Sequence, residues 1–170
     1  MDTAFDGFRS STMSSLGTIT YSGTLINNGF GLNAANGKFT APKNGKYSFH
    51  FRALANASET YVKLLQNGIQ KAATYRMVKK IIFDLTFISN YYFLQDRTSQ
   101  GTMLSMSVAL DLKKDDIVNV VLDSGILQDS DSLHYTHFSG YLIKEQVAFS
   151  AYKNSDTVVT FGYPEGYLSK

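Results

Sequence analysis

The sequence predicts an all-β domain, built as a sandwich or jelly roll of short strands, and three observations support this. Apolar and polar residues alternate along almost every segment of the chain, as they do in strands that bury one face. No apolar spacing of three and four residues is sustained between helix start and stop signals. Turn signals such as Asn67-Gly68 separate the alternating segments, which is typical of sandwiches and jelly rolls.

The pattern is clearest in "YSFHF", residues 47–51, where an aromatic residue occupies every second position. Successive residues of a strand point to opposite faces of a sheet, so Tyr47, Phe49 and Phe51 share one face. We expect this face to be buried in the core. The opposite face carries three polar side chains, which are Ser48, His50 and Arg52.

The next strands follow the same rule. "TYVKLLQNG", residues 60–68, is a short strand that ends in the hairpin signal Asn67-Gly68. "GTMLSMSVALDL", residues 101–112, places five apolar residues on one face, which are Leu104, Met106, Val108, Leu110 and Leu112. Its other face includes the small residues Ser105, Ser107 and Ala109, which would let a neighbouring subunit approach closely.

Two further strands are predicted near the end of the alternating region. "DIVNVVL", residues 116–122, points Val118, Val120 and Leu122 toward the core. "LHYTHFSGYLI", residues 133–143, ends in a run that is apolar enough to be buried. The predicted strands therefore extend from the beginning of the chain to about residue 144.

Composition restricts the class of protein. A chain of 170 residues with 44% apolar and 18% charged residues can build one packed domain and is not disordered. The net charge of +2 is too small to indicate a nucleic-acid partner. There is no cysteine, which excludes disulfides, zinc–thiolate sites and thiol nucleophiles.

The sequence gives no indication of a targeting or membrane-spanning segment. The start, "MDTAFDGFRSS", lacks the basic and apolar regions of a signal peptide, so we expect none in this chain. The longest apolar stretch, residues 81–94, contains Asp84 and is shorter than the roughly 20 residues that span a bilayer. We therefore expect no membrane insertion.

An internal similarity divides the chain. "TAFDGFRSS", residues 3–11, matches "VAFSAYKNS", residues 147–155, at most apolar and basic positions. The similarity is either a coincidence between two strand-like segments or the beginning of a second copy of the domain. We therefore predict a domain over residues 1–146. Residues 147–170 are then the truncated start of a second copy or a C-terminal tail that docks on a sheet edge.

The spacing of eight residues resembles the signature of the complement C1q globular-head family. These residues are Tyr21, Asn27, Leu32, Phe39, Gly45, Tyr47, Phe49 and Phe51, and the family pattern begins with Phe where this chain has Tyr21. "AFDGFRSS" resembles the family's first strand and "HFSGYLI" its closing strand. "VALDLKKDDIVNVVL" resembles the segment where the family usually has Gly-Asp, with Asp115 in the Gly position. The resemblance covers roughly residues 3–144.

The resemblance implies a ten-stranded jelly roll like that of tumour necrosis factor, assembled as a homotrimer. Such domains are secreted, extracellular recognition modules of innate immunity and related systems, without enzymatic activity and with no required cofactor. The expected function is non-covalent binding of a surface pattern, a glycan or a protein receptor. The alternative is a structural or adhesive component of extracellular matrix that is cross-linked through its trimers.

The chain departs from the family between the hairpin and residue 100, where it is some ten residues longer than usual. This insertion is rich in aromatic residues, and we expect residues 76–95 to form strand at a sheet edge or at the trimer periphery. Arg76, Lys79 and Lys80 either bind an anionic ligand or protect an edge strand from aggregation. Tyr91 and Tyr92 are candidates for the same ligand patch or for core and subunit contacts.

Three carboxylates suggest a possible metal site. Asp123, Asp129 and Asp131 fall within "DSGILQDSDS", a predicted loop. Oxygen ligands from one loop suit calcium, and a solvated acidic loop is the alternative. Calcium is thus the one cofactor that the sequence suggests.

The remaining candidates are an asparagine and two histidines. Asn56 begins the sequon "NAS" and is a possible glycosylation site if the protein is secreted. His134 and His137 lie three residues apart, which on a strand would place them on opposite faces and prevent a shared metal ion. No motif orients a base on a serine, so we expect no nucleophilic catalysis.

Overall fold

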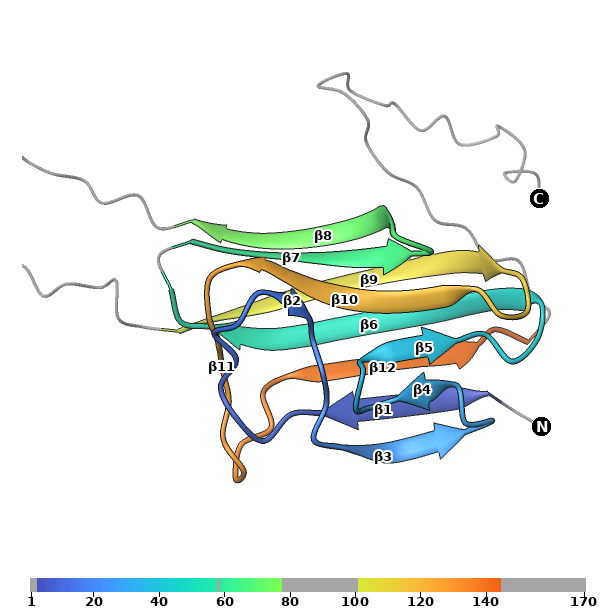
Figure 1. Cartoon of the computed structure of the whole chain (residues 1–170), viewed down its shortest axis with the longest axis horizontal. Coiled ribbons are helices and arrows are strands. Elements are labelled where there is room, and N and C mark those ends of the chain that lie inside the picture. The colour runs from blue at the N-terminus through green and yellow to red at the C-terminus, as the bar shows by residue number, and fades with distance from the viewer. Residues whose placement is uncertain (1–2, 58, 78–100, 145–170) are drawn as a thin grey trace, which may run out of the picture.

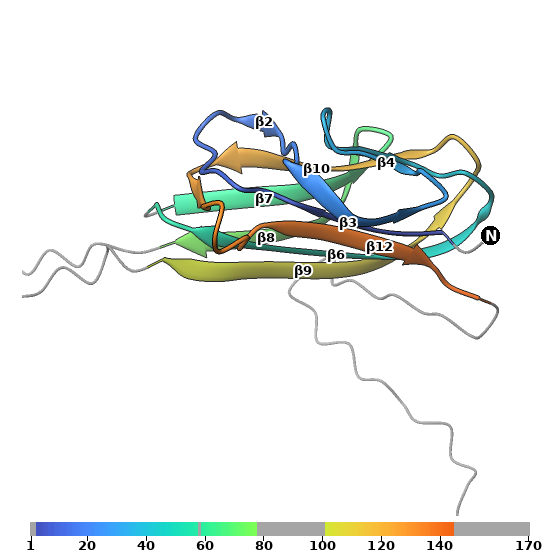
Figure 2. The ribbon, with the colours of Figure 1, turned by 90° about the horizontal axis from the view of Figure 1, so that it is seen from below.

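The computed structural model describes residues 3–57, 59–77 and 101–144. These residues form twelve strands and no helix, and the strands are arranged in two antiparallel sheets that pack face to face (Figures 1 and 2). Three of the twelve strands are only two residues long. The predicted all-β jelly roll is therefore confirmed. Within the described part of the chain, no helix is long and apolar enough to span a membrane.

Sheet A is built around a long central strand. β6 (Gly45–Ala55) pairs along its whole length with β9 (Thr102–Leu112). It also pairs with β12 (His137–Leu142), which is followed in the sheet by β1 (Ala4–Phe8) and then β3 (Gly23–Asn28). The short β11 (Leu127–Gln128) pairs with the last two residues of β6.

Sheet B covers sheet A on the other side of the core. Its order is β4 (Leu32–Asn33), β5 (Lys38–Thr40), β10 (Ile117–Ser124), β7 (Glu59–Gln66) and β8 (Ile69–Met77). β2 (Gly17–Thr18) also pairs with β10. Figure 2 shows the two layers, with β2, β4 and β10 on one side and β9 and β12 on the other.

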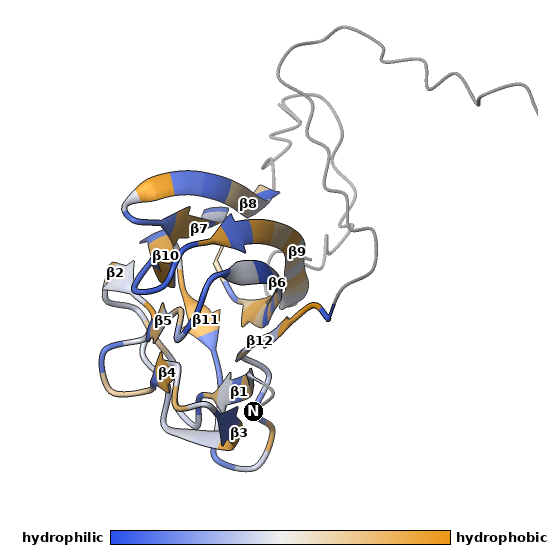
Figure 3. Ribbon diagram, turned by 90° about the vertical axis from the view of Figure 1, so that its right-hand side faces the viewer, coloured by the Kyte–Doolittle hydropathy of each residue, from blue (hydrophilic) through white to orange (hydrophobic). Residues whose placement is uncertain are grey.

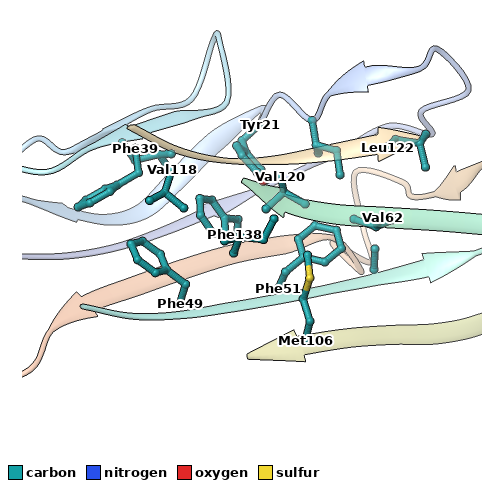
Figure 4. Packing of buried hydrophobic residues seen from close by; sticks show 14 of the residues in the cluster. Tyr21, Phe39, Phe49, Phe51, Val62, Met106, Val118, Val120, Leu122 and Phe138 are labelled. Atoms are coloured by element: carbon teal, nitrogen blue, oxygen red, sulfur yellow. The ribbon is translucent and has the colours of Figure 1, made fainter. Parts of the chain in front are cut away.

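The core lies between the two sheets and is dominated by aromatic rings (Figure 4). Tyr47, Phe49 and Phe51 are at most 2% exposed, which confirms the predicted inward face of β6. The Phe49 ring stacks on Phe138 of β12, with 5.9 Å between centroids, and packs edge-on against Phe39 of sheet B at 5.4 Å. These contacts join the two sheets through one cluster of rings.

The predicted inward residues of the other strands are also in or against the core. In β10, Val118, Val120 and Leu122 are fully buried. In β9, Leu104, Met106 and Leu112 are buried, whereas Val108 and Leu110 are partly buried and pack against the cluster. Hydrophobic and hydrophilic residues also follow one another along β8, the last strand of sheet B (Figure 3).

The hairpin predicted at Asn67-Gly68 is confirmed. It joins β7 to β8, and both residues have positive φ angles, 50° for Asn67 and 81° for Gly68. This is the backbone that a two-residue type I′ turn requires, and its twist matches that of the flanking strands.

Two predictions fall largely outside the described residues. β8 ends at Met77 and β9 begins at Thr102. The predicted strand over residues 76–95 is therefore observed only at Arg76 and Met77. The segment 147–170, predicted as a second copy or a docking tail, also lies outside the described residues.

Candidate interaction surfaces

The outward side chains of β1, β6, β9 and β12 form one surface, which we call the sheet A face. Ser105 and Ser107 of β9 are exposed on it and Ala109 is half-buried, as the alternation in residues 101–112 predicts. Met103 and Tyr141 are each 49% exposed and add apolar area. The middle of β9 thus presents short side chains on this face, and Met103 and Tyr141 make the face partly apolar.

The strand register arranges the central residues of this face in two neighbouring rows. In the first row, Asp6, Ser139, His50 and Ser107 lie opposite one another on four adjacent strands. In the second row, Phe8, His137, Arg52 and Ser105 do the same. Side chains that lie directly opposite on neighbouring strands have Cβ atoms about 5 Å apart, so the members of each row are close neighbours.

His50 is held by hydroxyl groups. Its Nε2 lies 3.0 Å from Oγ of Ser48 and its Nδ1 lies 2.9 Å from Oγ of Ser107, and its ring stacks on Tyr141 with 6.2 Å between centroids. A serine next to an imidazole is part of the serine-hydrolase arrangement, but there a carboxylate orients the imidazole. Here the imidazole of His50 lies between two serine hydroxyls and has no carboxylate of the described residues in that position. These contacts hold the His50 side chain in place and do not form a catalytic triad.

His137 is paired with a carboxylate instead. Its Nδ1 lies 2.7 Å from Oδ1 of Asp6. Its ring also contacts Phe8, whose centroid is 6.4 Å away, and the ring of His134 lies 4.4 Å from the same Phe8. The expectation that His134 and His137 point to opposite faces of a strand was wrong, because His134 lies before β12 with a φ of 43°.

A depression of about 460 Å³ lies in the middle of the sheet A face. We call it the Arg52 depression, and its lining consists of Asp6, His50, Phe51, Arg52, Ser105, Ser107, His137 and Ser139. Arg52 is exposed, and within the part of the chain that the structure describes its side chain makes no hydrogen bond, ion pair or ring contact. The sequence predicts that Arg52 points outward, but only the sheet register shows which polar groups surround it.

The three aspartates suggested for calcium have separate environments. Asp123 forms an ion pair with Lys63, at 2.8 Å, and Asp131 is exposed. Asp129 is 7% exposed, and its carboxylate accepts three backbone N–H groups, from Ser130 and Tyr135 at 2.9 Å and from Thr136 at 2.7 Å.

These contacts give Asp129 a role in holding the loop before β12. Within residues 3–57, 59–77 and 101–144, no group of three His, Cys, Asp or Glu side chains is placed to hold a metal ion. Calcium binding by the loop therefore stays a prediction of the sequence.

The residues suggested for a basic ligand patch are only partly described. Arg76 is 7% exposed, and its guanidinium Nη1 donates to the backbone carbonyl of Ala57. Its side chain is thus packed within the domain. The other members of the patch, Lys79, Lys80, Tyr91 and Tyr92, lie outside the described residues.

Asn56 and Phe30 are both exposed on loops. Asn56 directly follows β6, which keeps its amide accessible for the predicted glycosylation. Phe30 was missed by the sequence reasoning. It is 87% exposed with a φ of 51°, and a bulky residue with positive φ is uncommon. The neighbouring Gly29 could have indicated a tight turn, but no local pattern shows that the ring faces solvent.

The sequence and structure were compared with known proteins. The family model described as C1q domain matches residues 4–143. A comparison with curated protein sequences found no match.

Similar folds occur among solved structures. The globular domain of zebrafish complement 1qA protein is 17% identical, with a TM-score of 0.63 over 85% of this chain and 99% of that one. Murine APRIL at pH 5.0 is 12% identical, with a TM-score of 0.61 over 84% and 100%. Eiger TNF from S. frugiperda is 9% identical, with a TM-score of 0.58 over 89% and 99%. At these identities the structures support the fold alone.

The two-sheet fold defines the class of protein as a jelly roll of the kind seen in zebrafish complement 1qA protein and in Eiger TNF. Within that class, this chain belongs to the C1q domain family, because the family model matches 140 of its 170 residues, from 4 to 143.

The structure also gives physical reasons for the signature. Six of its eight residues are in the core, which are Tyr21, Leu32, Phe39, Tyr47, Phe49 and Phe51. Asn27 has a different role, because its side chain donates to the Leu32 carbonyl at 2.8 Å and accepts the Leu32 N–H at 3.2 Å. It thereby closes the turn between β3 and β4.

Proposed function

We propose that this protein is a trimeric recognition module that binds a glycan or a protein receptor without chemical reaction. The observation that carries the proposal is the match of the C1q domain model to residues 4–143. Domains of the C1q and tumour necrosis factor type generally form trimers, bind protein or glycan ligands and are typically extracellular. For this chain, trimer assembly, ligand binding and secretion are our proposals.

The sheet A face is the surface through which we propose that the subunits associate. Ser105, Ser107 and Ala109 have short side chains and allow a neighbour's backbone to approach closely. Met103 and Tyr141, each 49% exposed, supply apolar area that association would remove from water. The outer surface of sheet B then remains open to solvent and to ligands.

The association is tested by the molar mass of the full chain in solution. Light scattering at micromolar concentration should give about three times the 18.9 kDa mass of one chain. Ser107→Arg should give the monomer mass, because a long charged side chain would block close approach to β9. Ala73→Arg is the matched control, since Ala73 is exposed on β8 of sheet B, and it should leave the mass unchanged.

A monomeric wild-type chain would contradict the proposed assembly. Ligand binding is tested separately, by exposing the trimer to immobilised glycans and to candidate extracellular protein domains. Saturable binding to a defined glycan or protein supports the recognition function. Absence of saturable binding, with the protein retained only in insoluble matrix, would instead favour the structural role.

A further inference from the structure

The middle of the sheet A face carries a positive charge that has no partner among the described residues. The guanidinium of Arg52 makes no hydrogen bond or ion pair with residues 3–57, 59–77 or 101–144. Its cross-strand neighbours are Ser105 on β9 and His137 on β12. Neither neutralises it, because serine is uncharged and a histidine side chain carries no negative charge.

The groups around Arg52 are suited to an anion. The hydroxyls of Ser105 and Ser139 have no hydrogen-bond partner among the described residues, and they line the same depression of about 460 Å³. The Asp6 carboxylate also lines the depression, and its Oδ1 lies 2.7 Å from Nδ1 of His137. A guanidinium presents paired donors that match the geometry of sulfate and phosphate oxygens, and free hydroxyls can complete the coordination.

We infer that the Arg52 depression is an oxyanion site, which takes a sulfate or phosphate group when subunits associate. The inference rests on the proposed association through the sheet A face. Covering that face would remove Arg52 from water, and burial of an unpaired charge is strongly unfavourable. An oxyanion held by Arg52 and the neighbouring hydroxyls removes this obstacle, so association becomes anion-dependent.

The experiment measures self-association of the full chain by sedimentation velocity at constant pH, in sodium chloride and in sodium sulfate of equal ionic strength. Equal ionic strength keeps general screening the same. Sulfate should lower the half-association concentration by about tenfold, the change expected for a charged hydrogen bond of this kind. Repeating the titration with a sulfated disaccharide shows whether the site admits a glycan-borne group or only the free ion.

Two variants test whether a bound anion, rather than a carboxylate of a neighbouring subunit, neutralises Arg52 on association. Arg52→Gln removes the charge, so association in chloride should be at least as strong as in the wild type, and the sulfate effect should disappear. Lys71→Gln removes a charge from the exposed part of β8 in sheet B and should keep the sulfate effect. If Arg52→Gln instead weakens association in chloride, a carboxylate of a neighbouring subunit is the partner and the inference is wrong.

The failure of the proposed function can be told apart from the failure of this inference. If the wild type stays monomeric in both salts, the proposed association fails. Calorimetric titration of that monomer with sodium sulfate then decides the site, because saturable heat that is lost in Arg52→Gln supports it. The inference is overturned if the wild type associates no more strongly in sulfate than in chloride. For a monomeric wild type, it is overturned if the sulfate titration gives no saturable heat.

Discussion

Asp115 adopts a φ of 72° in the turn between β9 and β10, at the position where the C1q pattern usually has glycine. A left-handed backbone is strained for residues with a Cβ atom, and glycine adopts it without this cost. Asp115→Gly should therefore raise the free energy of unfolding by about 1 kcal/mol. The gain is measured by urea unfolding.

Asp115→Ala is the control for that change, because it removes the carboxylate but keeps the Cβ atom. It should not stabilise the domain. Equal stabilisation by alanine and glycine would show that the loss of the carboxylate, rather than the backbone angle, is responsible.

Phe49 is fully buried and its ring contacts Phe138 and Phe39. Phe49→Ala should lower the free energy of unfolding by ~3–5 kcal/mol, because it removes apolar contacts and leaves a cavity. The matched control is Phe30→Ala, where the ring is 87% exposed and the change should stay within about 0.5 kcal/mol. A similar loss for both variants, measured by chemical unfolding, would show that the packing of Phe49 has little energetic weight.

At the scale of elements, the hairpin between β7 and β8 is fastened to the turn before β10. The Asp116 carboxylate accepts the Asn67 side-chain amide at 2.8 Å, the Gln66 side-chain amide at 3.1 Å and the Lys113 backbone N–H at 3.0 Å. The amide of Asn67 contributes most to holding the pKa of Asp116 below its ordinary value, followed by the N–H of Lys113. These bonds stabilise the ionised carboxylate.

This lowered pKa predicts a pH-dependent contribution to stability. Because the folded pKa lies below the unfolded one, the contribution is fully present above the unfolded pKa of about 3.9. It is lost as the pH falls through the folded pKa. The stability difference between wild type and Asp116→Asn, measured by urea unfolding, should therefore be larger at pH 6 than at pH 3.

Asp131→Asn is the comparison for this effect, because Asp131 is exposed on its loop. Its difference from wild type should change less over the same pH interval. A difference for Asp116→Asn that is independent of pH would refute the role assigned to its hydrogen bonds.

At the scale of the whole molecule, the family match ends at residue 143, and β12, the last strand of the described residues, ends at Leu142. Deleting residues 147–170 should therefore leave the domain folded and, under the proposed function, trimeric. Circular dichroism and sedimentation velocity of the shortened chain provide the measurement. An unfolded product would mean that this segment belongs to the domain and is not the start of a second copy.

Much of the fold follows from local patterns. The period-two alternation predicted the buried faces of β6, β9 and β10, because neighbouring residues of a strand point in opposite directions. The Asn67-Gly68 turn was predicted since few other residue pairs accept two positive φ angles. The outward direction of Arg52 and of the serines of β9 followed from the same alternation.

The environments of the candidate site residues were less predictable. Arg76 was one candidate for a basic ligand patch, with protection of an edge strand as the alternative, and its side chain is buried and bonded to the backbone of Ala57. Asp129 was one of three possible calcium ligands, with a solvated acidic loop as the alternative, and its oxygens accept three backbone N–H groups of its own loop. In both cases the partner is a backbone group, and backbone groups leave no signature in the sequence.

The sequence by itself determined that this protein is a β sandwich of the C1q family, which strand faces are buried and where one hairpin turns. These features depend on short-range periodicity and spacing. Only the tertiary structure decided that His50 meets Ser107, that His137 meets Asp6 and that the Arg52 side chain has no partner among the described residues. These outcomes depend on the register between strands far apart in the chain, which is set by packing of the whole core rather than by any local stretch.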